Sequence, residues 1–131
     1  MTSKPIDFIT LAEVIEIHKN QISLYGGQEG IRDINLLSSA LALPKSTFDG
    51  EYLHKNIYEM AAAYAYHICQ NHPFIDGNKR VALVTALVFL EFNGIDINDP
   101  KGLLYDAMMN ISKGEVGKKQ IEEIFRKLAN N

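Results

Sequence analysis

Residues 80–92, RVALVTALVFLEF, constrain the fold of this chain more than any other segment. The segment is apolar on nearly every side, and a helix of that kind is stable only where other helices surround it. Asn93 and Gly94 follow it as a helix stop signal. The run is too short to cross a membrane, which takes ~20 apolar residues. The sequence therefore predicts the central helix of a bundle, and we expect no membrane role.

The first helix is predicted by a complete start signal. Thr10 is a favoured N-cap, and Glu13 stands at the position that closes a capping box. Apolar residues then recur at helical spacing until the glycine pair that begins at Gly26. His18 shares the apolar face of this helix, and we expect it to be a hydrogen-bonded packing residue.

Three further segments have helix caps or helical spacing. Asp33 can cap a short helix, which Pro44 prevents from continuing. Residues 55–70 have apolar side chains at helical spacing, with alanines that allow a neighbouring helix to approach closely. Asp99 is placed as the cap of another helix, with Pro100 at its first position.

The last helix is predicted to be amphipathic. The segment KKQIEEIFRKLANN places apolar residues on one face. Glu122 precedes Arg126, and Glu123 precedes Lys127, by the four residues that favour ion pairs on a helix surface. We expect both pairs to lie on a solvated face.

A hairpin is predicted between the second and third helices. In KSTFDGEYL, Asp49 and Gly50 stand between short β-prone pairs, as in a hairpin tip, although a plain loop fits these residues equally well. The chain contains no repeat and no linker. Residues 1–131 are therefore interpreted as a single all-α domain, a bundle of about six helices with a small β-hairpin.

Composition narrows the class of protein and its partners. The chain has 131 residues, of which 47% are hydrophobic, as suits one ordinary domain with a single core. Its net charge of −3 argues against a general affinity for nucleic acid or for anionic membranes. Cys69 is the single cysteine, and residues 1–8 lack the apolar core of a secretion signal, so we expect a cytoplasmic protein.

The stretch HPFIDGNKR, residues 72–80, joins two apolar helical segments. Pro73 excludes helical geometry for His72, so the preceding helix must end there and leave the imidazole at a bend. Gly77 permits a sharp turn, and Asn78 is a favoured N-cap for the next helix. That helix opens with backbone N–H groups that have no partner within the helix, and such a helix start attracts anions.

Side chains of the same stretch complete a candidate phosphate site. Lys79 and Arg80 place two cations at a helix start, where they oppose the helix dipole unless an anion binds there. Asp76 offers the hard oxygen that magnesium prefers, and His72 can accept a proton near neutral pH. Phe74 is expected to turn inward and anchor the bend. The same residues would also suit a polar connector that only caps helices.

Two other patterns carry less weight. GGQEG, residues 26–30, has neither the spacing nor the preceding strand of a dinucleotide loop, and it is interpreted as a helix connector. His67, Cys69 and His72 make a poor metal site, because residues 67 and 69 of one helix point in different directions and a fourth ligand is missing.

HPFIDGNKR closely resembles the signature of the Fic/Doc superfamily, His-Pro-Phe-x-Asp/Glu-Gly-Asn-Gly-Arg, and eight of its nine residues are ones that this superfamily uses. In that superfamily the loop lies between two central helices of an all-helical domain. The upstream stretch GGQEGIRDINLLSSALALP is similar to the death-on-curing (Doc) branch, and the compact length suits that branch. The resemblance covers most of the chain and is least distinctive in the last helix.

The resemblance implies a role for each residue of the bend. It implies that His72 is the general base acting on a target hydroxyl, and that Asp76 is a ligand of Mg2+, with ATP as the substrate. Pro73 and Phe74 correspond to the structural anchor of the motif. The implied phosphate-binding residues are Gly77, Asn78, Lys79 and Arg80.

Two positions bear on the reaction that the resemblance implies. Where AMP-transferring members have a second glycine in the phosphate cradle, this chain has Lys79, and where they commonly have a further arginine it has Leu83. Both differences resemble Doc toxins, which transfer the terminal phosphate of ATP to a Ser or Thr hydroxyl of a translation elongation factor and so inhibit translation. Gly77 is closer to the general Fic form, which keeps AMP transfer as an alternative. A helical binding module without chemistry is a further alternative.

The resemblance also implies two protein partners. The predicted hairpin corresponds to a flap that holds a target segment as an added strand. Its residues are Thr47, Phe48, Asp49, Gly50, Glu51 and Tyr52. Many Fic proteins inhibit themselves with a Ser/Thr-x-x-x-Glu-Gly/Asn helix, whereas here Thr47 and Glu51 are followed by Tyr52. Inhibition by a separate antitoxin is therefore implied, through a short segment that folds as a helix on this domain.

Overall fold

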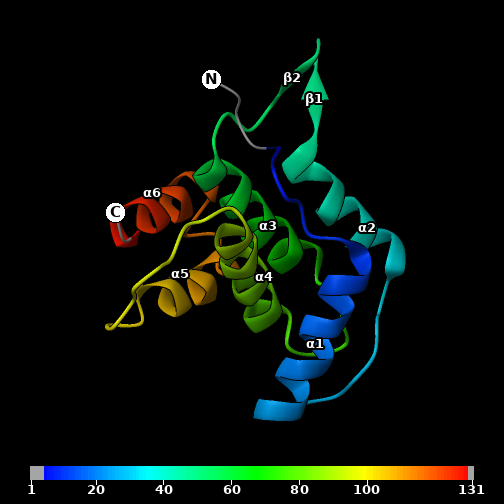
Figure 1. Cartoon of the computed structure of the whole chain (residues 1–131). Coiled ribbons are helices and arrows are strands. Elements are labelled where there is room, and N and C mark those ends of the chain that lie inside the picture. Colours follow the sequence, from blue (N-terminus) through cyan, green and yellow to red (C-terminus); the bar gives the residue numbers. More distant parts are fainter. Residues whose placement is uncertain (1–4, 130–131) are drawn as a thin grey trace.

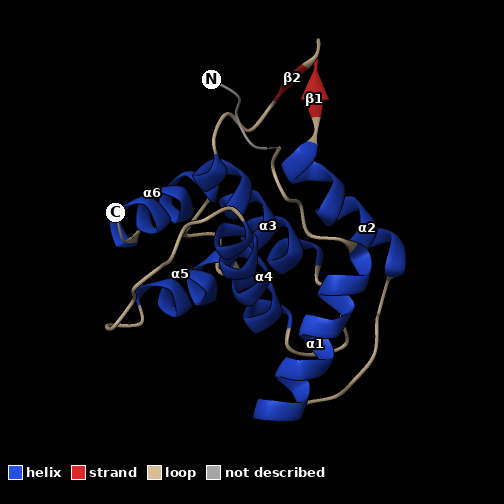
Figure 2. Ribbon diagram, viewed as in Figure 1, coloured by secondary structure: helices blue, strands red, loops and turns tan. Residues whose placement is uncertain are grey.

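The computed structural model describes residues 5–129 (Figure 1). Within this range the chain forms six α-helices, one short 3-10 helix and a two-stranded antiparallel sheet, which confirms the predicted all-α bundle with a small hairpin (Figure 2). The elements in chain order are α1 (Leu11–Tyr25), α2 (Ile34–Ala42), η1 (Leu43–Lys45), β1 (Thr47–Phe48), β2 (Glu51–Tyr52), α3 (Ile57–Asn71), α4 (Asn78–Phe92), α5 (Leu103–Ile111) and α6 (Lys118–Leu128).

Helices α3 and α4 form the centre of the molecule. α4 packs along α3, whereas α2, α5 and α6 also contact α3, and α1 lies against α4 (Figure 1). Ala61, Ala62, Ala63 and Ala65 of α3 are fully buried, and their small side chains allow the neighbouring helices to approach closely. α3 contacts more of the other helices than α4 does, and residues of α4 such as Leu83 remain half-buried. None of the helices in the described range is long and apolar enough to span a bilayer.

The segment before α1 is attached to the core through Tyr64 of α3. The Tyr64 hydroxyl accepts a hydrogen bond from the Ile9 N–H at 2.9 Å, and both residues are buried. Burial raises the pKa of Tyr64 to about 12. Phe8 packs against Phe89, near the carboxyl end of α4, and also against Tyr52 of the hairpin. These contacts fix the hairpin at the end of the bundle where α4 terminates.

Most helix ends follow the local signals in the sequence. The Thr10 side chain accepts the Glu13 N–H, and the Glu13 carboxylate accepts the Thr10 N–H, so the predicted capping box of α1 is confirmed. The Asp33 carboxylate caps α2 as predicted. The predicted start of α5 is wrong by three residues, because Pro100 lies in a turn and Gly102 precedes the first helical residue. Asp99 still caps this helix, across the turn.

The predicted solvated face of α6 is wrong at Glu122. This residue is 8% exposed, although it forms the predicted ion pair with Arg126, at 2.8 Å. A second contact, at 3.9 Å, joins it to Lys119. Arg126 also lies over the ring of Tyr58 on α3. Glu122 is buried because α6 packs against α3 on the side that carries this pair.

The predicted hairpin is confirmed. β1 and β2 form its two strands (Figure 2). Thr47 pairs with Tyr52, and Phe48 pairs with Glu51. Asp49 and Gly50 form the two-residue turn, and both have positive φ angles, 53° and 79°. Two positive φ angles are what the tightest hairpin turns require, which explains the Asp-Gly pair at the tip.

Candidate active site

The candidate site is the bend between α3 and α4, and His72 lies where α3 ends. His72 adopts a left-handed conformation, with φ 50° and ψ 54°, and its N–H still donates to the Ile68 carbonyl at 3.2 Å. Pro73 follows and prevents another helical turn. The chain therefore leaves the helix at His72, and this residue is exposed, as the sequence predicts.

Asn78 holds the bend closed. Its side-chain amide donates to the Phe74 carbonyl, and its side-chain oxygen accepts the Phe74 N–H, both at 2.9 Å. The prediction that Asn78 is the N-cap of α4 is wrong, because Asn78 is the first helical residue and Gly77, with φ 77°, is the cap. The buried Asn78 side chain is thus hydrogen-bonded within the bend. Its contribution to a phosphate site would therefore come from its backbone N–H.

His18 of α1 supports the bend from inside. Its ring stacks on the ring of Phe74, with centroids 4.0 Å apart, and its Nε2 lies 2.9 Å from the Asp76 carbonyl oxygen. His18 is 3% exposed and Phe74 is fully buried. The predictions of a hydrogen-bonded packing role for His18 and of an inward-facing Phe74 are both confirmed.

The segment between α1 and α2 is more than the connector that its sequence indicates. The Gln28 N–H donates to the Asp76 carboxylate at 3.0 Å, and the Ile75 N–H donates to the Gly30 carbonyl at 3.1 Å. The Pro73 carbonyl accepts the N–H groups of the two residues that precede α2. Gly27 has a φ of 117°, and a Cβ on it would lie 2.8 Å from the Asp76 carboxylate. This segment therefore forms the outer wall of the bend.

Arg32, from the same segment, completes the end of α3. Its Nε donates to the His72 carbonyl at 2.7 Å, and its Nη2 donates to the Asn71 carbonyl at 3.0 Å. The last carbonyls of a helix have no partners within the helix, and a cation is favourable at that end. Arg32 thus fixes the backbone from which the His72 imidazole projects.

Asp76 is an exposed carboxylate whose two oxygens both accept backbone hydrogen bonds. The N–H groups of Gln28 and Gly77 each donate to one of its oxygens, and these two hydrogen bonds are the main causes that lower the pKa of Asp76. The carboxylate therefore remains ionised, and its oxygens have further lone pairs. One hard, ionised oxygen donor beside an anion site fits magnesium, which is usually bound by one or two carboxylates and by the phosphates of its substrate.

A cavity of about 330 Å³ lies over the bend. Lys79 and Arg80 line it, and among residues 5–129 neither has a carboxylate within 4.0 Å. The Arg80 guanidinium instead lies over the Tyr25 ring, at 4.1 Å. The first α4 residue whose N–H donates back to the preceding turn is Val81, to the Gly77 carbonyl. The cavity thus brings together a helix start and two cations without counter-ions, which is the electrostatic environment of a phosphate site.

Comparison with known proteins agrees with this geometry. Residues 8–90 match the model of the Fic/DOC family. The chain belongs to the Fic/DOC family. It is 30% identical over 120 residues to a protein kinase doc of Escherichia phage P1, across 92% of this chain and 94% of that protein. It is also 37% identical over 73 residues to a toxin Doc of Mycolicibacterium smegmatis, and this match spans 56% of each chain. The expected resemblance to the Doc branch is confirmed.

The structure places the Fic/DOC motif and the hairpin at different ends of the bundle. The hairpin projects beyond the start of α3, whereas the bend follows the end of α3 (Figure 1). α3 has 15 residues, so these ends are separated by ~22 Å along its axis. The six hairpin residues are absent from the lining of the cavity over the bend. The site is thus formed by the motif and by the segment between α1 and α2, without the hairpin.

Four residues that line the cavity over the bend were not identified as site residues from sequence, and they are Gly26, Ile75, Tyr105 and Met109. Tyr105 and Met109 of α5 line the cavity, and both are partly exposed. They stand four residues apart on one face of α5, and their exposure is the only feature that distinguishes them from packing residues. Their proximity to His72 depends on how α5 packs against α4, which no local pattern records.

Proposed function

We propose that this protein is a Doc-type toxin that transfers the terminal phosphate of ATP to a Ser or Thr hydroxyl of a target protein, with Mg2+ as cofactor. The observation that carries the proposal is the arrangement of Lys79 and Arg80 at the start of α4, beside exposed His72 and ionised Asp76. The names of the two relatives, a toxin Doc and a protein kinase doc, support both parts of the proposal.

The charged and titratable residues of the site have separate roles in this reaction. The N–H groups at the start of α4, with Lys79 and Arg80, hold the phosphates of ATP. His72 accepts the proton of the target hydroxyl while the hydroxyl oxygen attacks the terminal phosphorus of ATP. The bond between that phosphorus and the oxygen that bridges it to ADP breaks, and ADP leaves with this oxygen. Arg32 keeps the His72 backbone in place, and Asp76 would hold the magnesium ion. When bound, that ion neutralises negative charge on the phosphates.

Lys79 favours phosphate transfer over AMP transfer. A glycine at this position leaves room for a phosphate to settle against the backbone, whereas a lysine side chain fills that space and adds charge. The nucleotide is then held with its terminal phosphate toward the attacking hydroxyl. AMP transfer is the alternative, and Gly77, which matches the general Fic motif, is the feature that supports it.

The proposed target is a translation elongation factor in the cytoplasm, and its modification would stop translation. The hairpin is proposed to hold a segment of this target by strand addition, since β1 and β2 each have an edge in a sheet of only two strands. Because α3 separates the hairpin from the bend, the target must be large enough to contact both. An antitoxin segment that folds as a helix on this domain is the proposed inhibitor.

Isotope labelling tests the reaction. The protein is incubated with Mg2+, a cell lysate and ATP that carries the label on either the α or the γ phosphate. We expect the γ label, and not the α label, to appear on one acceptor protein. His72→Ala should slow the transfer ~10²- to 10⁴-fold, because it removes the general base.

Two results would redirect the proposal. Transfer of the α label would show AMP transfer. If His72→Ala leaves toxicity in cells unchanged while the purified variant melts like the wild type, the bend caps helices without doing chemistry.

A further inference from the structure

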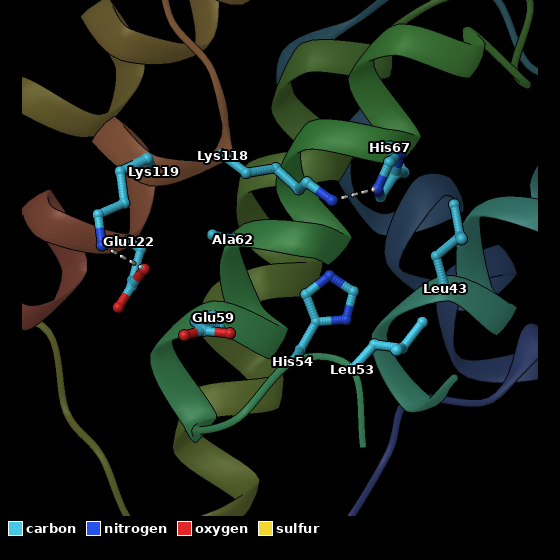
Figure 3. Close-up of a pocket in the computed structure, with 9 residues that line it drawn as sticks. All are labelled: Leu43, Leu53, His54, Glu59, Ala62, His67, Lys118, Lys119 and Glu122. Atoms are coloured by element: carbon cyan, nitrogen blue, oxygen red, sulfur yellow. Dashed lines mark hydrogen bonds and ion pairs between the residues drawn. The ribbon is translucent and has the colours of Figure 1, made fainter. Parts of the chain in front are cut away.

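A second cavity lies beside α3 and shares no lining residue with the cavity over the bend (Figure 3). Its volume of about 590 Å³ exceeds that of the cavity at the bend, and small-molecule sites commonly span about 300 to 1,000 Å³. η1, the loop after the hairpin, α3 and α6 contribute its walls. The lining residues are Leu43, Leu53, His54, Glu59, Ala62, His67, Lys118, Lys119 and Glu122.

Lys118 is the cation in this cavity. Its Nζ extends from the start of α6 toward α3 and lies 3.2 Å from Nε2 of His67 (Figure 3). Because an ammonium group only donates hydrogen bonds, the His67 Nε2 must accept, and His67 is neutral in this contact. In the described part of the chain no carboxylate lies within 4.0 Å of Lys118.

The two imidazoles add no counter-charge to Lys118. Burial, and then the charge of Lys118, lower the pKa of His67 to about 4. The same two causes also lower the pKa of His54, against the opposing effects of Glu59 and of the Leu43 backbone. Both rings are therefore neutral near pH 7. The Nδ1 of His54 is buried, and it makes no hydrogen bond of good geometry with any described residue.

The two carboxylates of the cavity are engaged elsewhere. The Glu59 carboxylate accepts the Lys55 N–H at 2.8 Å, just before α3, while the Asn56 side chain caps the helix by accepting the Glu59 N–H. Glu122 pairs with Arg126 and with Lys119, whose side chain turns toward Glu122 and away from His54 (Figure 3). Lys118 is thus left as a half-buried charge that an anion would stabilise.

We propose that this cavity binds a small molecule that has one carboxylate on a short apolar body. The carboxylate accepts a hydrogen bond from Lys118 and provides the missing counter-charge. Leu43, Leu53 and Ala62 provide the apolar contact for the rest of the molecule. These apolar walls favour an organic carboxylate over inorganic phosphate, which needs hydrogen-bond donors on every side. The inference does not depend on phosphate transfer at the bend.

Histidine NMR signals test this proposal directly. The protein is titrated with hexanoate, with uncharged hexanamide of the same shape and with inorganic phosphate, while the ring signals of His54 and His67 are followed. We expect hexanoate to shift both signals with saturation, and at least tenfold higher concentrations of hexanamide or phosphate to be needed for the same shift.

A pair of variants adds a control on the same helix. Lys118→Met keeps the length of the side chain and removes its charge, and it should weaken hexanoate binding at least tenfold. Lys119→Met should bind like the wild type, because Lys119 pairs with Glu122. The proposal is overturned if hexanamide or phosphate binds as well as hexanoate, if no signal saturates, or if Lys118→Met binds like the wild type. The comparison of the three probes on the wild type remains valid even if a variant fails to fold.

Discussion

The position of the Asp76 carboxylate depends on Gly27, which lies beside it and has no side chain. Gly27 combines a φ of 117° with close contact to the Asp76 carboxylate, so a side chain there is unfavourable for two reasons. Its neighbour Gly26 has a φ of 85° but nothing within 4 Å of an added Cβ. Comparison of these two glycines separates the general cost of backbone strain from the specific support of Asp76.

Gly27→Ala is expected to raise the pKa of Asp76 toward its ordinary value. The added methyl group pushes the carboxylate away from the Gln28 N–H, which is the largest cause of the lowered pKa. Gly26→Ala should carry the cost of backbone strain without the close contact, and it should leave the pKa of Asp76 unchanged. An NMR titration of the Asp76 carboxyl carbon measures both. Equal Asp76 pKa values in the two variants would contradict the structural role given to Gly27.

At the level of elements, local sequence signals predicted where helices form, but they did not predict the contacts between helices. The caps Thr10 and Asp33 were predictable because a cap bonds to residues three or fewer positions away. The role of Asn78 was not predictable, because its side chain turns back to hydrogen-bond with the Phe74 backbone instead of capping α4. The hydrogen bond from the Gln28 N–H to the Asp76 carboxylate joins residues 48 positions apart, and no feature of GGQEG predicts it.

Tyr64→Phe is expected to loosen the attachment of the first segment to α3. The change leaves the buried Ile9 N–H without its partner, and an unpaired buried donor costs about 1 to 3 kcal/mol. Tyr66→Phe on the same helix removes a hydroxyl that, among residues 5–129, accepts a hydrogen bond only from exposed Gln70, and it should cost well under ~1 kcal/mol. Urea unfolding of both variants measures the difference. Equal losses would show that the bond to Ile9 contributes nothing.

At the scale of the whole molecule, the cavity beside α3 makes stability depend on pH. His67 has a pKa of about 4 in the folded chain and an ordinary value of 6.5. Between these values the unfolded chain binds a proton that the folded chain does not, so stability falls as the pH decreases through this window. His54, whose pKa is also lowered, acts in the same direction. Asp76 contributes only below its ordinary value of 3.8.

The melting temperature should therefore fall as the pH is lowered from 7 to 4. His67→Gln keeps a hydrogen-bond acceptor for Lys118 but cannot take up a proton, so its melting temperature should fall less over this window. The melting temperature of Asp76→Asn should change with pH as steeply as that of the wild type in this range. A wild-type slope that persists unchanged in His67→Gln would assign the acid sensitivity to other groups.

The outer wall of the bend has a consequence for the length of the chain. A surface segment between two helices ordinarily tolerates insertions well. Here Gln28, Gly30 and Arg32 each contact a different part of residues 71–76. The length of this segment is therefore matched to the length of the bend. One extra amino acid between α1 and α2 would shift these contacts out of alignment. Although this segment lies on the surface, an insertion in it would therefore disrupt the bend.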